Sequence, residues 1–297
     1  MNRSYLFAIS LATTIVISCN SKLTPQHGEV LNKQSTDTHG NPMLLGKCTR
    51  EKLTDTPYAS WFKKNYDDYS VDTATAEILR EKLKNKNLMI FMGTWCGDSR
   101  REVPRMFKIL DYCGIKPVDI QLIMVDSHDS VYKQSPTHEE RGLNIHRVPD
   151  LLVFQKGNEI GRIVESPVNS LEKDLVAIVE GHNYVPNYQI VPLLVKLFDK
   201  ENTKQINEHL DHIYTEAKPL MKHPAELTSY GHVLMAASEK EKAEIAFKLN
   251  TMLYPDNPNM FEALGNYYHS TGNETLANEN LEKARLLKSQ QAPKKSQ

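Results

Sequence analysis

Residues 88–99 are LMIFM followed by GTWCGDS, an apolar run that ends in a short turn holding a tryptophan and a cysteine. Five consecutive apolar residues predict a strand buried on both faces of a sheet. From Arg100 to Tyr112 the apolar spacing is helical, with Pro104 inside it. The sequence therefore predicts a buried strand, a tight turn and a helix, with Cys96 at the start of the helix.

The segments around this motif extend it into a complete α/β domain over residues 41–185. Strands and helices follow the order βαβα and then ββα, which predicts a central mixed sheet with helices on both faces. A Lys-Gly-Asn turn at residues 156–158 closes the last two strands into a hairpin. Besides the elements above, the predicted strands are 120–125, 151–154 and 159–164, and the predicted helices are 74–86 and 171–180.

Three landmarks match the thioredoxin-fold family in order and spacing. Trp95-Cys96 ends a buried strand and opens a helix, Pro104 follows the cysteine by eight residues, and Val148-Pro149 precedes an apolar strand. The chain resembles that family over about 100 residues. The resemblance implies a thioredoxin-like fold, a cis proline at Pro149, and substrate binding by Trp95, Val148 and Pro149 beside a reactive Cys96.

Cys96 is the candidate nucleophile. A cysteine at a helix N-terminus meets free backbone N–H groups and the positive end of the helix dipole, and both favour the thiolate. Arg100 and Arg101 lie one turn further along and add stabilisation, whereas the carboxylate of Asp98 opposes it. We therefore expect a moderately reactive thiol.

The motif departs from the family at two positions. Family members that turn over disulfides carry Cys-x-x-Cys, but the fourth residue here is Ser99, whose hydroxyl can donate a hydrogen bond to the thiolate yet cannot form a disulfide. The family also buries an aspartate six residues before the first cysteine, where this chain has Ile90. Both departures predict a monothiol site with Cys96 and Ser99 as its catalytic residues.

The other cysteines are expected to play unlike roles. Four cysteines in 297 residues are too few for a disulfide scaffold. Cys113 lies 17 residues from Cys96 along the same predicted helix, about 25 Å away, whereas a disulfide needs Cα atoms within about 7 Å. Cys113 is therefore expected to be a buried structural thiol. The position of Cys48 stays open, and no stable disulfide is expected among the four.

Three uses of a lone activated thiol stay open. The thiol forms mixed disulfides that an external thiol resolves; it traps or isomerises clients held at Pro149; or the site is idle and the fold only binds. No cofactor or metal is expected, because His128, His138 and His146 lack the short spacing of a dedicated metal site and are interpreted as surface residues. His146 is the histidine best placed to approach Cys96 as a base.

The N-terminus predicts export. Residues 1–18 place Arg3 before an apolar run that is too short for a membrane span. The run ends in Val-Ile-Ser-Cys at residues 16–19, which resembles the bacterial lipobox. The resemblance implies cleavage before Cys19 and lipid attachment to it, anchoring the chain in the bacterial cell envelope and facing the periplasm. The alternative is an ordinary signal peptide that happens to contain a cysteine. Residues 19–40 are polar and predict a flexible tether.

A second, helical domain is predicted over residues 190–291. Residues 224–257 and 258–291 align with a period of 34, which resembles the tetratricopeptide family, and residues 190–223 form an adaptor or cap. The resemblance implies stacked helix pairs with a concave face for peptides or partner proteins. The matching positions are Gly231, Ala243, Phe247 and Pro255 in the first copy and Phe261, Leu264, Gly265, Tyr268, Ala277, Leu281 and Ala284 in the second.

Composition narrows the function classes. The 36 Lys+Arg and 37 Asp+Glu give a formal charge of -1, which argues against nucleic-acid binding through a basic surface. The leading hypothesis is an envelope-anchored, thioredoxin-like thiol protein that forms mixed disulfides through Cys96 with exported proteins, a small thiol or a redox partner protein recruited by the helical repeats. It would be a monothiol thiol–disulfide oxidoreductase or isomerase. The alternative is a non-catalytic envelope adaptor that uses both domains for protein binding.

Overall fold

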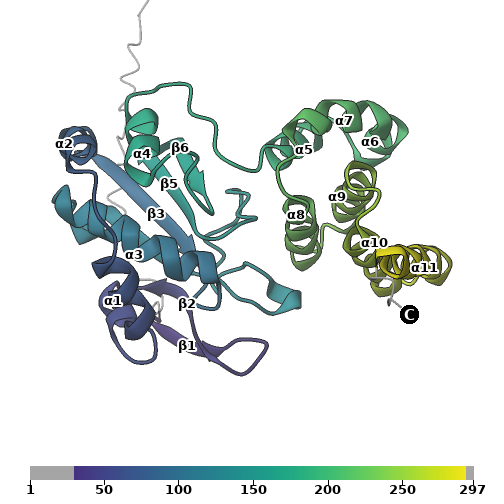
Figure 1. Ribbon diagram of the computed structural model, residues 1–297, viewed down its shortest axis with the longest axis horizontal. Helices are drawn as coiled ribbons and strands as arrows, with labels where there is room; N and C mark the ends of the chain where they lie inside the picture. The colour runs from purple at the N-terminus through teal and green to yellow at the C-terminus, as the bar shows by residue number, and fades with distance from the viewer. Residues whose placement is uncertain (1–29, 292–297) are drawn as a thin grey trace, which may run out of the picture.

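The computed structural model describes residues 30–291 as a six-stranded sheet with helices, followed by a region built only from helices (Figure 1). The expected export signal at residues 1–18 and the expected lipid-bearing Cys19 lie outside the described residues. Among the described helices, none is long and apolar enough to cross a membrane.

The sheet is mixed and has the strand order β1-β2-β4-β3-β5-β6. Strands β3 and β4 are parallel, while each other neighbouring pair is antiparallel. Helix α3, Gly97–Tyr112, connects β3 to β4, so the centre of the sheet is the predicted strand–helix–strand unit. The strands are β1 Lys33–Thr36, β2 Pro42–Cys48, β3 Lys86–Met92, β4 Ile120–Met124, β5 Asp150–Gln155 and β6 Asn158–Val164.

The helices of the first part pack together on one face of the sheet. Every second strand residue, such as Ile90, Leu122 and Leu151, faces a core that also contains residues of all four helices. The expectation of helices on both faces is therefore wrong for the described residues. The helices are α1 Ala59–Asp67, α2 Thr73–Lys82, α3 and α4 Leu171–Val179, with 3-10 turns η1 Glu51–Thr54 and η2 Pro117–Asp119.

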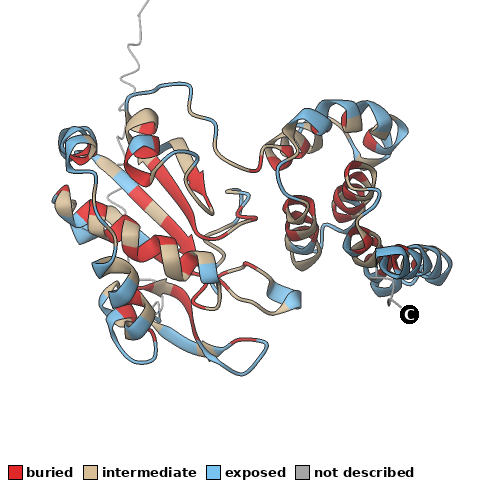
Figure 2. Cartoon of the chain, in the orientation of Figure 1, coloured by how far each residue is buried: buried red, intermediate tan, exposed pale blue. Residues whose placement is uncertain are grey.

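The opposite face of the sheet is covered by the β4–β5 connection, residues 125–149, which contains the 3-10 turn η3 Asp129–Val131. Ile145 and Val148 of this connection pack with Phe91 and Ile123 in a separate apolar cluster. Both faces are therefore buried over the last three residues of β3 and of β4, 90–92 and 122–124, and a loop rather than a helix covers the second face (Figure 2).

The sheet begins earlier than expected. Residues 33–36 fall within the predicted tether, yet they form β1 and pair with β2, and β2 pairs in turn with β4. Backbone pairing with β2 explains why these residues are extended, because the side chains of β1 are exposed or half-buried and contribute little to a core. The expected tether is therefore wrong over these residues.

The helical region contains two hairpins that repeat with the predicted period of 34. In the first, a Cβ added to Gly231 would lie 2.5 Å from the ring of Phe247; in the second, a Cβ added to Gly265 would lie 2.7 Å from Leu281. Both glycines thus allow close helix contact at the same point of the repeat. The helices are α5 Ile190–Phe198, α6 Thr203–Glu208, α7 Leu210–Ala217, α8 Ala225–Ala236, α9 Lys240–Leu253, α10 Pro258–Ser270 and α11 Glu274–Gln291, with 3-10 turn η4 Lys218–Leu220.

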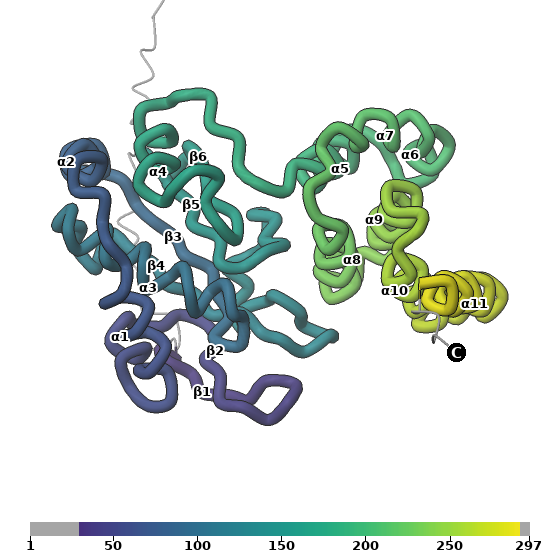
Figure 3. The backbone as a smooth tube through the Cα atoms, viewed as in Figure 1, coloured from purple at the N-terminus to yellow at the C-terminus, as the bar shows by residue number. Residues whose placement is uncertain are grey.

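The two parts of the chain meet where α8 packs against the β4–β5 connection. The backbone trace shows α8 as the helix of the second part that faces the loops of the first (Figure 3), and α8 contacts η3 directly. A cleft of about 490 Å³ lies along this boundary, with Lys133 and Ile145 on one side and Tyr230 and Leu234 on the other.

Candidate thiol site

Cys96 is the N-cap residue of α3, with an extended backbone (φ -86, ψ 126), and its side chain makes no capping hydrogen bond. Its carbonyl accepts the N–H of Arg100 at 3.0 Å, which starts the helical ladder. The side chain is half-buried. The first-turn N–H groups and the positive end of the helix dipole therefore lie beside a cysteine that is only half-buried.

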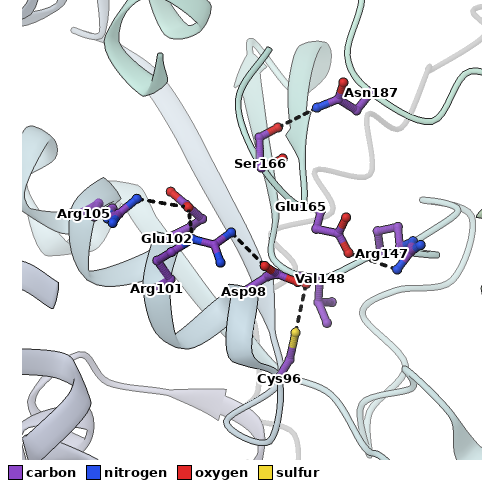
Figure 4. Close-up of polar contacts among 10 residues, drawn as sticks. All are labelled: Cys96, Asp98, Arg101, Glu102, Arg105, Arg147, Val148, Glu165, Ser166 and Asn187. Carbon is purple, nitrogen blue, oxygen red and sulfur yellow. Dashed lines mark hydrogen bonds and ion pairs between the residues drawn. The ribbon is translucent and has the colours of Figure 1, made fainter. Parts of the chain in front are cut away.

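The sulfur lies against the segment that precedes β5. The Cys96 thiol donates to the carbonyl of Val148 at 3.3 Å (Figure 4). The Val148–Pro149 peptide bond is cis, as the resemblance implied. Trp95 and Cys96 both pack on the apolar cluster that contains Val148. The fold thus brings the predicted residues Trp95, Cys96, Val148 and Pro149 together from two separate segments of the chain.

Trp95 is fixed by the turn that it belongs to. Its indole N–H donates to the carbonyl of Val125 at 2.9 Å. The ring lies over Gly93, where an added Cβ would come within 2.5 Å of the indole. A side chain at position 93 would therefore displace the tryptophan that flanks the thiol.

Ser99 is fully buried beneath the same turn. Its hydroxyl accepts the backbone N–H of Gly93 at 3.3 Å. Among the described residues, no hydrogen bond joins the Ser99 hydroxyl to the Cys96 sulfur. The geometry assigns Ser99 the bracing of the turn, and the predicted hydrogen bond to a thiolate stays a prediction.

Charged side chains of α3 and of the segments around Pro149 form ion pairs near the thiol (Figure 4). Asp98 accepts from Arg101 at 2.7 Å, and Glu165 accepts from Arg147 at 3.0 Å. Burial raises the pKa of Glu165 above its ordinary value, although Arg147 opposes this. Two nitrogens of the Arg147 side chain, Nε and Nη2, are buried and make no hydrogen bond within the described chain, while the guanidinium lies over the Tyr188 ring at 4.8 Å.

Lys133 is a buried cation near the site that the sequence did not predict. Its side chain is 3% exposed. Burial lowers its pKa from 10.5 to about 7, with a further decrease from Arg147, while the negative charge of Cys96 acts in the opposite direction. The residues next to Lys133 in the sequence do not indicate that it is buried, because a helix distant in the sequence covers it.

The other described cysteines differ from Cys96. Cys113 is buried at the far end of α3 and donates to the carbonyl of Ala76 at 3.4 Å. Burial raises its pKa to about 11 and that of Cys48, at the end of β2, to about 12. All three described cysteines are free thiols. No group of three or more His, Cys, Asp or Glu residues within 30–291 is arranged to hold a metal ion.

His146 is buried, so its interpretation as a surface residue is wrong. Its Nδ1 lies 3.0 Å from the carbonyl of Asn144, and its ring packs edge-on against Tyr188 and Tyr230. Burial lowers its pKa to about 3, which makes it a poor proton acceptor for Cys96 at neutral pH.

His128 and His138 are half-buried and lie 2.6 Å and 3.0 Å from the carboxylates of Asp126 and Glu140. Each histidine thus has a local acidic partner. Neither contact involves Cys96.

Comparison of this chain with models of protein families, with curated proteins and with solved structures found no match.

Proposed function

We propose that the protein is a thioredoxin-like monothiol that exchanges its Cys96 thiol with disulfides of exported proteins. The observation that carries the proposal is the position of Cys96 at the N-cap of α3, half-buried and packed with Trp95 on the apolar cluster that contains Val148. A half-exposed thiol with free helix N–H groups is the arrangement that favours nucleophilic sulfur.

The reaction is a thiol–disulfide exchange in two steps. The Cys96 thiolate attacks one sulfur of a client disulfide, the client S–S bond breaks, and the second client sulfur leaves as a thiolate. An external thiol, as its thiolate, then attacks the mixed disulfide and displaces Cys96. Because Ser99 stands where a resolving cysteine would lie, the second step requires this external co-reactant.

The helical region is proposed to recruit the client or redox partner. Support comes from two 34-residue hairpins with equivalent glycine contacts at Gly231 and Gly265, an arrangement similar to tetratricopeptide repeats. The lipobox-like residues 16–19 support attachment to the bacterial envelope through Cys19.

The direct test is mixed-disulfide formation by the full chain. The protein is incubated with an oxidised model peptide that contains one disulfide, and intact mass is measured under non-reducing conditions. We expect an adduct on Cys96 that is lost in Cys96→Ser and retained in the control Cys113→Ala. Glutathione added afterwards, as the external thiol, restores the unmodified mass.

The absence of an adduct at Cys96 would contradict the proposal. If the wild-type chain forms no adduct at Cys96 over a range of pH from 6 to about 8.5, where an ordinary thiol is half ionised, the proposed chemistry is wrong. The non-catalytic adaptor then accounts better for the fold, and Cys96→Ala would leave partner binding unchanged.

A further inference from the structure

The segment 146–148 is held from two sides, by the thiol and by the helical region. The Cys96 thiol donates to the carbonyl of Val148 at 3.3 Å. Two residues earlier, the carbonyl of His146 accepts from the Lys133 ammonium at 2.7 Å and from the Ser229 hydroxyl at 2.6 Å. Ser229 belongs to α8, so the second domain bonds directly to the segment that contacts the thiol.

These contacts form a closed and buried triangle. The Lys133 ammonium also donates to the Ser229 hydroxyl at 2.5 Å. Lys133 is 3% exposed and Ser229 is 7% exposed. Because water has little access, loss of either side chain leaves the remaining polar groups without full compensation. The triangle therefore fixes the position of the His146 backbone.

A second connection reaches the other flank of the thiol. The ring centroids of Trp95 and Tyr132 are 6.1 Å apart, and those of Tyr132 and His232 on α8 are 6.2 Å apart. Ser229 and His232 are three residues apart on one helix and therefore share a face. One face of α8 thus bonds directly to the segment that leads to Val148 and reaches Trp95 through Tyr132.

We propose that α8 is a component of the thiol site, with Ser229 and His232 as positioning residues. Ser229 fixes the segment that leads to Val148 and Pro149, and His232 fixes Trp95 through Tyr132. This inference rests on the proposed function, because it assigns a role in the reaction of Cys96. It also gives the helical region a second role besides recruitment.

A peptide disulfide and a small alkylating reagent depend on the site in different ways. A peptide disulfide must lie beside Val148 and Trp95 while Cys96 attacks, so its reaction depends on the geometry of both segments. A small alkylating reagent needs only an accessible thiolate. Loss of the α8 contacts should therefore slow exchange with a peptide far more than alkylation by a small reagent.

The test uses the full chain and two rates measured at Cys96 by peptide mass spectrometry. One is the rate of exchange with an oxidised model peptide, and the other is the rate of alkylation by iodoacetamide. We expect Ser229→Ala to lose about tenfold in the first rate and less than about twofold in the second, in line with one buried hydrogen bond. The matched control is Ser270→Ala on α10, where the hydroxyl donates only to the Tyr267 carbonyl of the same helix.

A second variant keeps the test decisive if Ser229→Ala does not fold. His232 is exposed on α8 and its ring also packs edge-on against Phe247; His232→Ala should still fold, and His212→Ala, at an exposed position of α7, is its control. We expect His232→Ala to slow exchange with the peptide about threefold while alkylation is unchanged.

Three outcomes overturn the inference. If Ser229→Ala and Ser270→Ala are equally active, or if both rates fall together, α8 does not position the peptide-binding segment, and the proposed function stands. If the wild-type chain alkylates at Cys96 but never exchanges with the peptide, the proposed function fails and this inference fails with it.

Discussion

One helix carries a cysteine at each end, and the two thiols have opposite environments. Cys96 is the N-cap of α3, is half-buried and lies beside Val148. Cys113 is the C-cap of the same helix, is 4% exposed and donates to the Ala76 carbonyl. The residue type is identical, so the difference comes entirely from position.

The helix itself contributes to this contrast. The N-terminus presents N–H groups that stabilise an anion, whereas the C-terminus presents carbonyls that destabilise one. At Cys113 burial adds to the second effect, since desolvation is the largest cause of its raised pKa and outweighs the attraction of Arg80. One helix thus places one thiol half-buried at its N-terminus and the other buried at its C-terminus.

The largest expected effect is the difference in alkylation rate between the two ends. A thiol with a pKa of about 11, such as Cys113, is about 0.01% ionised at pH 7, against about 3% for an ordinary thiol. We therefore expect iodoacetamide to label Cys113 about 300-fold more slowly than an ordinary thiol, and to label the half-buried Cys96 faster than Cys113. Comparable labelling of both cysteines in the folded chain would remove the contrast.

A second thiol at the reactive end should convert the chemistry. Positions 96 and 99 are one turn apart, within the Cα separation that a disulfide accepts. We expect Ser99→Cys to form an internal disulfide on oxidation and to release bound peptide about a hundredfold faster, because attack becomes intramolecular. Intact mass shows the loss of two hydrogens. The wild-type chain should show no bridge between Cys96 and Cys113, and detection of one would contradict the position of α3.

Lys133, on the side of Cys96, and Arg80, near Cys113, should differ in how they change the pH dependence of the unfolding free energy. Lys133 has a folded pKa of about 7, below its ordinary 10.5, so the unfolded chain binds more protons between these values. The stability contributed by Lys133 is complete above pH 10.5 and is lost as pH falls to about 7.

Lys133→Met should remove this loss, and the change in unfolding free energy between pH 7 and 9.5 should shrink by about 1–3 kcal/mol. Urea unfolding at several pH values measures it. The control is Arg80→Met near Cys113, whose guanidinium stacks on Tyr112 at the surface. If both variants keep the wild-type slope, Lys133 is not buried as a cation.

The smallest expected effect concerns acidic residues beside each thiol. Asp98 is partly exposed and paired with Arg101, and its carboxylate opposes the thiolate of Cys96. We expect Asp98→Asn to increase the alkylation rate at pH 6 about two- to threefold, less at high salt. Glu77→Gln, near Cys113, should change nothing measurable because burial dominates there. A slower Asp98→Asn would show that the carboxylate supports the thiolate.

Sequence reasoning succeeded where a feature is local. The run at residues 88–92 and the turn that follows it predicted a strand, the start of a helix and the position of Cys96. Pro149 was placed as a cis proline from the motif around it. Gly231 and Gly265 identified the helical hairpins because close contact between helices requires a small residue at a fixed spacing.

Sequence reasoning failed where a feature depends on distant parts of the chain. Strand β1 is KQST, four polar residues whose only reason to be extended is pairing with β2. Lys133 and Ser229 are 96 residues apart, and no pattern in either segment indicates that they meet. His146 was misplaced for the same reason, because Tyr230 of α8 helps to bury it.

The β4–β5 connection also bears on how such a protein could change over evolution. The contacts to α8 described above come from Tyr132, Lys133 and His146, all within the β4–β5 connection. Replacement of residues 129–133 alone would remove Tyr132 and Lys133, which contact His232 and Ser229 of α8, while Val125, Ile145 and Val148 would keep their contacts with the sheet, Trp95 and Cys96. A free-standing thiol domain and one governed by an attached helical module would then differ by a single loop exchange.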